Sequence, residues 1–234
     1  MAARPGQENL PIPQHLAQLV KDAIPPIHPE ARRFVAVPLV AVVAGWRWPS
    51  VRVLGLATAA AVALFFRNPD RVPPTEAGSV VAPADGEVTL VDEAVPPAEL
   101  GLGTLPLPRV SIFLSVLDVH VQRAPVAGTV AHIAYQPGEF LPADVADAST
   151  RNERSSMRIE TADGVAVGVV QIAGLVARRI LCEVAEGDEL ALGQTYGLIR
   201  FGSRVDTYLP AGTELLVRVG QRAMGAETLL ARLP

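Results

Sequence analysis

The fold is decided by the stretch Val80-Val81-Ala82-Pro83-Ala84-Asp85-Gly86-Glu87-Val88, because its form recurs later in the chain. The second copy is Val121-Gln122-Arg123-Ala124-Pro125-Val126-Ala127-Gly128-Thr129-Val130. Each copy has a proline followed by a glycine that leads into a β-branched run, and an internal repeat of this kind indicates a repeated structural unit. Two similar turns, each leading into a strand, predict a pseudo-symmetric β sandwich.

Short β-branched runs separated by glycine and proline surround both copies and predict mostly antiparallel strands. The runs are Ser79–Val91, Arg109–Leu117, Gly128–Tyr135, Ser156–Thr161, Val165–Ile172 and Glu214–Val219. A further element, Val184–Leu190 with Gly193-Gln194, resembles the hairpin of lipoyl and biotinyl carrier domains, but it has no lysine to modify. The predicted fold class is therefore mainly β (α+β), with an antiparallel sandwich or barrel-sandwich domain over residues 67–234.

Two apolar stretches precede this domain, Phe34–Trp46 and Val51–Phe66. Each is shorter than the roughly 20 residues that a bilayer span needs. Arginines flank the pair, and Trp46 and Trp48 lie near its bend, where amphipathic rings suit the level of the lipid headgroups. Residues 34–66 therefore predict a helical hairpin that dips into one leaflet of the cell membrane from the cytoplasmic side. A buried soluble helix pair is the alternative.

Residues 1–33 form a polar arm punctuated by proline, in which Gln14–Ile24 can make a short amphipathic helix. The arm lacks the order of a secretory signal, because no apolar core follows a basic start. The net charge of −4, without a basic run interleaved with aromatic residues, excludes a nucleic-acid partner. A single cysteine, Cys182, precludes an internal disulfide. It has no ligand-like spacing to the histidines, so no metal is expected.

The pair Gly202-Ser203, within Phe201–Asp206, is suited to self-cleavage. Glycine leaves its own carbonyl sterically open and tolerates strained φ and ψ angles. The hydroxyl of Ser203 can therefore attack the carbonyl of Gly202 and convert the peptide into an ester. Elimination from that ester would leave a pyruvoyl group at position 203. The alternative is an ordinary turn.

The scarcity of lysine favours the first interpretation. Of the 20 lysine and arginine residues, only Lys21 is a lysine, and it lies in the polar arm. Amine substrates are usually activated as imines, and pyridoxal enzymes hold their cofactor on a lysine in the pocket. A chain that performs imine chemistry without such a lysine needs a built-in carbonyl, and a pyruvoyl group is one.

His120 and Asp85 are the candidates to assist Ser203. His120 follows the apolar run Val110–Leu117, so it is expected near a strand end, and imidazole has a suitable pKa to take the serine proton and later return one. Asp85 would orient that imidazole, as in Asp-His-Ser arrangements. The alternatives are a core histidine and a solvated turn aspartate. His132, inside a predicted strand, is the alternate base and is better explained as structural.

The chain resembles a known family. The segment Gly197–Pro210 is similar to the processing segment of the short-form phosphatidylserine decarboxylases, whose Gly-Ser bond is the cleavage point. Five further matches lie in the family order: Phe65–Arg71, Ala82–Gly86, Phe113–His120, Asn152–Arg154 and Gln171–Ile180. The resemblance covers about residues 34–220.

This resemblance implies a pyruvoyl-dependent carboxy-lyase that converts phosphatidylserine of the membrane into phosphatidylethanolamine. The substrate amine would form an imine with the pyruvoyl group, which accepts the electrons released as the carboxylate departs. Cleavage would give chains 1–202 and 203–234, which remain together as a heterodimer, and an inserted apolar surface is compatible with a further dimer. Asp85, His120 and Ser203 carry over as the self-processing triad.

Other residues carry over less firmly. Asp118 either joins the imidazole as a second carboxylate or fixes the strand end. Longer bacterial relatives have a second histidine where this chain has Arg123, so either His120 serves both processing and decarboxylation, or Arg123 holds a phosphate or carboxylate. Arg178 and Arg179 are candidates to grip the phosphate, or are a solvated pair. The polar stretch from Ala146 through Asn152–Arg154 predicts a mobile loop near the lipid headgroup.

Two other classes of protein remain open from the residues alone. A lipid hydrolase would use Ser203, His120 and Asp85 and stay one intact chain, although the sequence lacks the Gly-x-Ser-x-Gly elbow. A non-catalytic, membrane-anchored module of the lipoyl type would keep its cellular function after Ser203→Ala.

Overall fold

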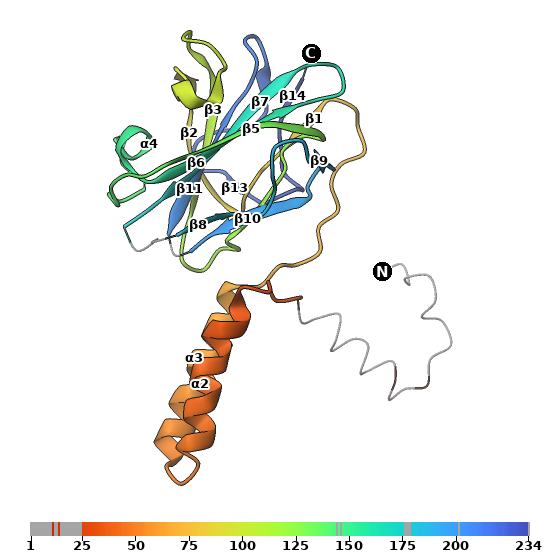
Figure 1. The fold of residues 1–234 in the computed structure, drawn as a ribbon. Coiled ribbons are helices and arrows are strands. Elements are labelled where there is room, and N and C mark those ends of the chain that lie inside the picture. The colour runs from red at the N-terminus through yellow and green to blue at the C-terminus, as the bar shows by residue number, and fades with distance from the viewer. Residues whose placement is uncertain are drawn as a thin grey trace. The chain divides into compact units, whose positions relative to one another are not determined.

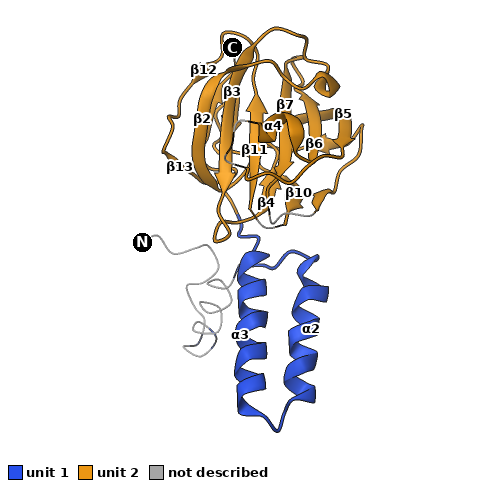
Figure 2. Ribbon diagram, turned by 90° about the vertical axis from the view of Figure 1, so that its left-hand side faces the viewer, with its two compact units in different colours: residues 1–70 blue, residues 71–234 orange. Residues whose placement is uncertain are grey.

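The structure, a computed structural model, describes residues 11, 14, 25–143, 145, 147–175, 179–200 and 202–233. The chain divides into two compact units, residues 1–70 and 71–234 (Figure 2). Of the helix expected over Gln14–Ile24 only Gln14 is described, and Lys21 lies outside the described residues.

The first unit contains two helices, α2 (Ala31–Ala44) and α3 (Pro49–Phe65). Pro49 stands at the first position of α3, where its missing N–H costs no hydrogen bond and its fixed φ suits the helix. A methyl group on Gly55 would lie 3.0 Å from the Pro38 carbonyl oxygen, so the two backbones approach closely there. The expected apolar helical hairpin is thus confirmed. Among the described residues, neither helix has the length and hydropathy required to cross a bilayer.

The second unit is built from short antiparallel strands (Figure 1). Its first half has β1 (Ser79–Val81), β2 (Gly86–Ala94), the 3-10 turn η1 (Ala98–Leu100), β3 (Leu107–Leu114), β4 (Val121–Arg123), β5 (Gly128–Gln136) and helix α4 (Ala148–Arg151). Its second half has β6 (Arg154–Glu160), β7 (Ala166–Ala173), β8 (Ile180–Cys182), β9 (Glu189–Leu190), β10 (Thr195–Ile199), β11 (Ser203–Tyr208), β12 (Glu214–Leu215), β13 (Arg222–Ala223) and β14 (Leu229–Arg232).

Among the described residues these strands form one large sheet, in the order β13-β2-β3-β11-β7-β6-β5-β9, and two small ones, β1-β14-β12 and β4-β10-β8. The neighbouring strands pair antiparallel. Side chains from all three sheets, among them Val88, Val205, Ile199 and Leu230, form one apolar core. The mainly β fold class expected from the sequence is confirmed.

The two sequence copies occupy equivalent places. Each forms a three-residue strand, a turn and a nine-residue strand: β1 and β2 in the first copy, β4 and β5 in the second. The turns bond to each other reciprocally, since the Val81 N–H donates to the Pro125 carbonyl at 2.9 Å and the Arg123 N–H donates to the Pro83 carbonyl at 2.8 Å. This exchange brings the turn that carries Asp85 next to the strand that follows His120.

Three strand expectations need correction. The run Ser79–Val91 is broken at residues 82–85, where Pro83 offers no N–H to a ladder, and its two halves belong to different sheets. The run Glu214–Val219 is a strand only over Glu214–Leu215. Strand β11 was not anticipated, although it lies between β3 and β7 in the large sheet and all six of its residues are buried.

Candidate active site

Ser203 is the first residue of β11 and lies opposite Leu114 of β3 and Ala173 of β7. Its side chain is completely buried, and its Oγ makes no hydrogen bond with any described residue. A buried hydroxyl usually has a partner, because an unpaired one loses its hydration without compensation. An unpaired hydroxyl at this position is available as a nucleophile.

Gly202 presents the adjoining carbonyl. Its φ of +65° is in the left-handed region that glycine adopts without strain, and an added Cβ would meet nothing within 4 Å. Its carbonyl oxygen accepts a hydrogen bond from the Gly174 N–H at 3.1 Å. Its own N–H donates to Nε2 of His120 at 3.3 Å. The peptide preceding Ser203 is therefore held at both its N–H and its carbonyl.

His120 is buried at the end of the turn that follows β3. Its Nδ1 lies 2.9 Å from the carbonyl oxygen of Asp118. Because a carbonyl can only accept, Nδ1 carries the proton and Nε2 keeps its lone pair toward Gly202. The His120 carbonyl accepts from Gln122 Nε2 at 2.8 Å, and Gln122 in turn accepts from Gln171 of β7 at 2.9 Å. This buried amide pair ties the histidine to the central sheet.

The carboxylate of Asp118 fixes the turn. It accepts hydrogen bonds from the Ser115 N–H at 2.8 Å and the Ser115 hydroxyl at 2.7 Å, and it pairs with Arg222. Burial alone would raise the pKa of Asp118, but the hydrogen bonds from Arg222 and Ser115 outweigh it and lower the pKa. Asp118 thus contacts the imidazole of His120 through its backbone carbonyl, while its carboxylate closes the turn.

Asp85 lies in the first sequence turn. Its carboxylate pairs with Arg71 at 2.6 Å and accepts from the Gly225 N–H at 2.8 Å. Burial raises the pKa of Asp85, offset in part by Gly225 and Arg71, and the charges of Asp118 and Arg123 also act on it. The aspartate therefore belongs to the same electrostatic neighbourhood as the turn before His120. Its role in orienting the imidazole stays a prediction.

The remaining candidates lie in different environments. Arg123 is buried at the end of β4 and donates to the Gly193 carbonyl at 3.2 Å. Arg179 is exposed, and Arg178 lies outside the described residues. His132 forms a surface pair with Glu186 at 2.7 Å. Within the described part of the chain, no group of three or more metal-ligating side chains converges.

One residue near the site was missed. Asn152 was expected in a mobile loop near the headgroup, but it is fully buried between the short helix α4 and β6. Its side chain accepts from the Leu141 N–H at 3.0 Å, and donates to the Leu141 and Ala173 carbonyls, each at 2.8 Å. The long-range bonds of this amide, which nothing in the local sequence indicates, explain the wrong expectation.

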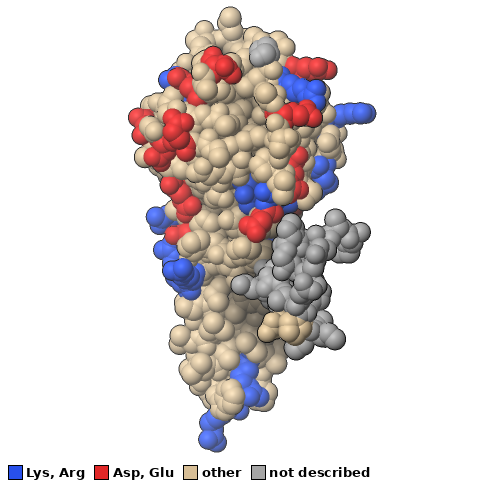
Figure 3. All heavy atoms as spheres, turned by 90° about the vertical axis from the view of Figure 1, so that its right-hand side faces the viewer, with Lys and Arg blue, Asp and Glu red and all other residues tan. Residues whose placement is uncertain are grey.

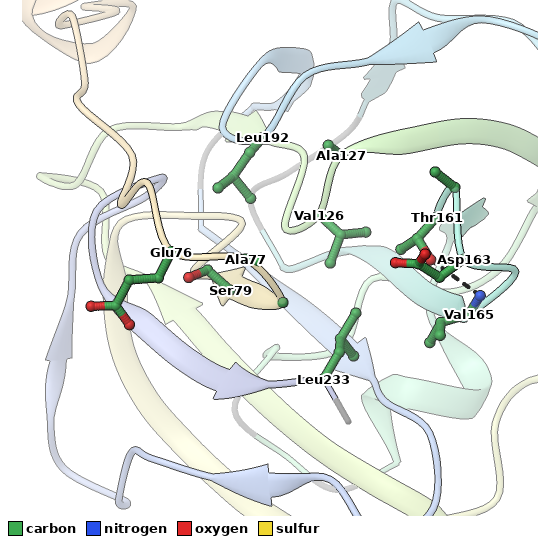
Figure 4. A pocket seen from close by; sticks show the side chains of 12 residues that line it. Glu76, Ala77, Ser79, Val126, Ala127, Thr161, Asp163, Val165, Leu192 and Leu233 are labelled. Atoms are coloured by element: carbon green, nitrogen blue, oxygen red, sulfur yellow. Dashed lines mark hydrogen bonds between the residues drawn. The ribbon is translucent and has the colours of Figure 1, made fainter.

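A cavity of about 500 Å³ lies elsewhere in this unit (Figure 4). It is lined by residues of the β6–β7 turn, among them Thr161, Asp163 and Val165, together with Glu76, Ser79 and Leu233. This turn precedes β7, whereas Ala173, which lies opposite Ser203, ends it. The cavity is therefore at the opposite end of the strand from Ser203.

The groups around Ser203 are compatible with acyl transfer within the chain: a buried hydroxyl, a Gly202 carbonyl whose oxygen accepts a hydrogen bond, and an imidazole nitrogen that accepts from the Gly202 N–H. The family model described as phosphatidylserine decarboxylase matches residues 58–231.

Three relatives are named phosphatidylserine decarboxylase proenzyme. The protein of Rhodococcus erythropolis is 63% identical and that of Nocardia farcinica 61%, each over 100% of both chains. The protein of Mycobacterium tuberculosis is 57% identical over 99% of both chains. The chain belongs to the phosphatidylserine decarboxylase family. The family resemblance and the carboxy-lyase class expected from the sequence are confirmed, and the hydrolase and non-catalytic alternatives are not supported.

Proposed function

We propose that the chain cuts itself between Gly202 and Ser203, and that the processed protein decarboxylates phosphatidylserine to phosphatidylethanolamine. The observation that carries this proposal is the Ser203 hydroxyl, which is completely buried, makes no hydrogen bond with the described residues and follows a glycine of positive φ. The position of His120 Nε2 at the same glycine supports it.

Self-cleavage begins when the Oγ of Ser203 forms a bond to the carbonyl carbon of Gly202. The π electrons of the carbonyl move to its oxygen, and we assign the hydroxyl proton to Nε2 of His120, which must first release the hydrogen bond that it accepts from the Gly202 N–H. Breakage of the C–N bond then returns that proton to the nitrogen of Ser203. The peptide has become an ester, and Ser203 carries a free amine.

Loss of the α proton of Ser203 next breaks the bond between its Cβ and Oγ, and Gly202 leaves as a carboxylate. The dehydrated residue isomerises to an imine, and water hydrolyses it, which releases ammonia and leaves a pyruvoyl group. Because Ser203 is the first residue of β11, this group would lie at the end of a strand that pairs with β3 and β7. The pyruvoyl carbonyl supplies an electron sink for decarboxylation of an amino acid headgroup.

The chain's own residues have defined tasks in that second reaction. β11 remains bonded to β3 on one side and β7 on the other, so position 203 stays fixed after the cut. His120, held by the Asp118 carbonyl, is assigned the proton that replaces the departing carbon dioxide. We assign the headgroup phosphate to Arg179, because its side chain is exposed whereas that of Arg123 is buried.

The helical unit is proposed to lie in one leaflet of the membrane, on the cytoplasmic side. Several of its apolar side chains are exposed, including Val43 at 74% and Trp46 and Trp48 at 68% and 66%. The long tan surface in the lower half of Figure 3, with basic groups near its tip, is that of this unit. An exposed apolar patch of this kind is typical of a membrane or protein contact, and tryptophan with arginine suits the headgroup level.

Exposed apolar residues also flank the cleavage site on the β unit. β3 and β7 end at Leu114 and Ala173, the residues opposite Ser203, so the segments that follow them leave the sheet at the same end. These segments carry Leu117 and Leu175, exposed at 77% and 63%. We assign this end of the sheet to the approach of the lipid headgroup.

The decisive experiment is the intact mass of the purified protein. We expect a fragment that begins at position 203 and carries a pyruvoyl group in place of serine, and that gains the mass of a trapped amine after treatment with cyanoborohydride and an amine. Ser203→Ala should stay full length and release no carbon dioxide from phosphatidylserine vesicles. A full-length wild-type protein that still releases carbon dioxide would refute the proposal.

A further inference from the structure

The peptide that joins Ala173 to Gly174 bonds in two directions. Its carbonyl accepts a hydrogen bond from Asn152 Nδ2 at 2.8 Å, and its N–H donates to the carbonyl oxygen of Gly202 at 3.1 Å. A single peptide unit thus links the buried amide of Asn152 to the carbonyl that Ser203 attacks. In such a chain each hydrogen bond polarises the next and strengthens it.

We propose that Asn152 is a positioning residue for self-cleavage: it orients and polarises the 173–174 peptide, so that the Gly174 N–H stabilises the negative charge that forms on the Gly202 oxygen. This inference rests on the proposed self-cleavage. As the Oγ–C bond forms, the carbonyl electrons move onto an oxygen that already faces this donor. A hydrogen bond to an ionised acceptor is roughly twice as strong as one to a neutral acceptor, so the stabilisation grows toward the transition state.

The surroundings of Asn152 fix its orientation. The Leu141 N–H donates to its Oδ1 at 3.0 Å, so the amide nitrogen must face the other way, toward the carbonyls of Leu141 and Ala173. The side chain of Asn152 is completely buried. The next residue, Glu153, also bonds to the end of β7, because its carbonyl accepts a hydrogen bond from the Ala173 N–H at 2.9 Å. The end of β7 is therefore held from two consecutive residues.

Gly174 independently fits the role of donor. A Cβ on Gly174 would lie 2.3 Å from the Gly202 oxygen and 3.2 Å from the Cβ of Ala143. Only a residue without a side chain lets the N–H come this close to the carbonyl. The buried amide of Asn152 on one side of the peptide and the absence of a side chain at Gly174 on the other thus serve the same hydrogen bond.

The test follows cleavage of freshly synthesised full-length chain in a cell-free system, by the appearance of the 203–234 fragment. Asn152→Ala removes the amide, and Asn152→Asp keeps the acceptor for Leu141 but replaces the donor to Ala173. Loss of a whole oxyanion donor slows reactions about 10²–10³-fold, so loss of its support is expected to slow cleavage about 10–100-fold. Val167→Ala, a buried core change on the same strand far from Ser203, is the control for lost stability.

A second measurement separates positioning from general damage. After the cut the Gly202 carbonyl has become a carboxylate, so the hydrogen bonds that run from Asn152 through the 173–174 peptide no longer assist a reaction. We therefore expect the cleaved fraction of each Asn152 variant, counted by its pyruvoyl content, to decarboxylate phosphatidylserine at the wild-type rate.

Three results would overturn the inference. Asn152→Ala that cleaves as fast as wild type would refute it, with the proposed function intact. It would also be refuted if Val167→Ala, at the same loss of stability, slowed cleavage as much as the Asn152 variants. A third refuting result is an Asn152 variant that loses cleavage rate and decarboxylation rate per pyruvoyl group to the same extent. A wild-type chain that never cleaves would instead remove the proposed function and this inference together.

Discussion

A methyl group at position 174 tests how closely the scissile carbonyl is held. The Cβ of Gly174→Ala would stand 2.3 Å from the Gly202 oxygen. Carbon and oxygen normally approach to about 3.3 Å, so one of the two groups must move by about 1 Å. That movement breaks the 3.1 Å hydrogen bond from the Gly174 N–H and shifts the carbonyl away from Ser203. Because misplacement of about 1 Å costs about 10²-fold and a lost oxyanion donor about 10²–10³-fold, we expect self-cleavage to slow by 10²-fold or more.

The assay is the time course of fragment 203–234 after cell-free synthesis of the full chain. Gly164→Ala is the matched control, since it makes the same substitution in the β6–β7 turn, at the other end of β7. Its φ of +76° strains an alanine by about 1–2 kcal/mol, but its added Cβ meets nothing within 4 Å. Cleavage of Gly164→Ala should match wild type. Wild-type cleavage by Gly174→Ala, or equal slowing by both variants, would refute the reasoning.

Three further outcomes are expected. Arg204→Met leaves the buried carboxylate of Asp206 without its 2.8 Å partner and should lower the free energy of unfolding in urea by about 3 kcal/mol, with Arg109 still 3.8 Å away; no change would contradict this. Asp118→Asn should destabilise the protein at neutral pH. The pKa of Asp118 is lowered in the folded state, so its ionised carboxylate stabilises the protein fully above the ordinary aspartate pKa of about 3.9, and this stabilisation is lost as the pH falls through the folded pKa. The free energies of unfolding of the variant and the wild type should therefore converge in acid. A difference that stays constant with pH would contradict this expectation. Trp46→Ser combined with Trp48→Ser should weaken cosedimentation with anionic vesicles about tenfold or more, since burial of one large apolar side chain contributes about 1.5–3 kcal/mol, and unchanged binding would argue against insertion of the hairpin.

The sequence predicts best where the determinants are local. The repeated turn with its proline and glycine gives the same strand, turn and strand in both copies, because turn chemistry and two-residue alternation act within a few residues. The Gly202-Ser203 pair is also apparent from local chemistry alone. What the sequence does not contain is the reciprocal bonding of the two turns, which arises only when they meet across the domain.

Strand β11 was missed because Gly202-Ser203 was interpreted as a cleavage point or an ordinary turn, and no strand was predicted after it. Arg204 and Asp206 stand on either side of Val205 in the strand and point away from the core that Val205 enters. They are nonetheless buried, because they neutralise each other and Arg204 donates to the Ala143 carbonyl of the segment that covers them, at 3.1 Å. The burial of such a charged pair depends on a covering segment about 60 residues away in the sequence. The pattern of apolar and polar residues within the strand cannot predict that segment.

The position of the proposed cut in the sheet explains how a chain can be severed next to its central strand and keep its site. Residues 203–234 stay paired with residues 1–202 through β11 with β3 and β7, β13 with β2, and β14 with β1. Removing the peptide bond before Ser203 breaks none of these ladders, because Gly202 lies outside β11. The free energy that holds position 203 therefore comes from hydrogen bonds between strands rather than from chain continuity. This separation allows residue 203 to be converted chemically while His120 and Gly174, which bond to Gly202 in the intact chain, stay in place.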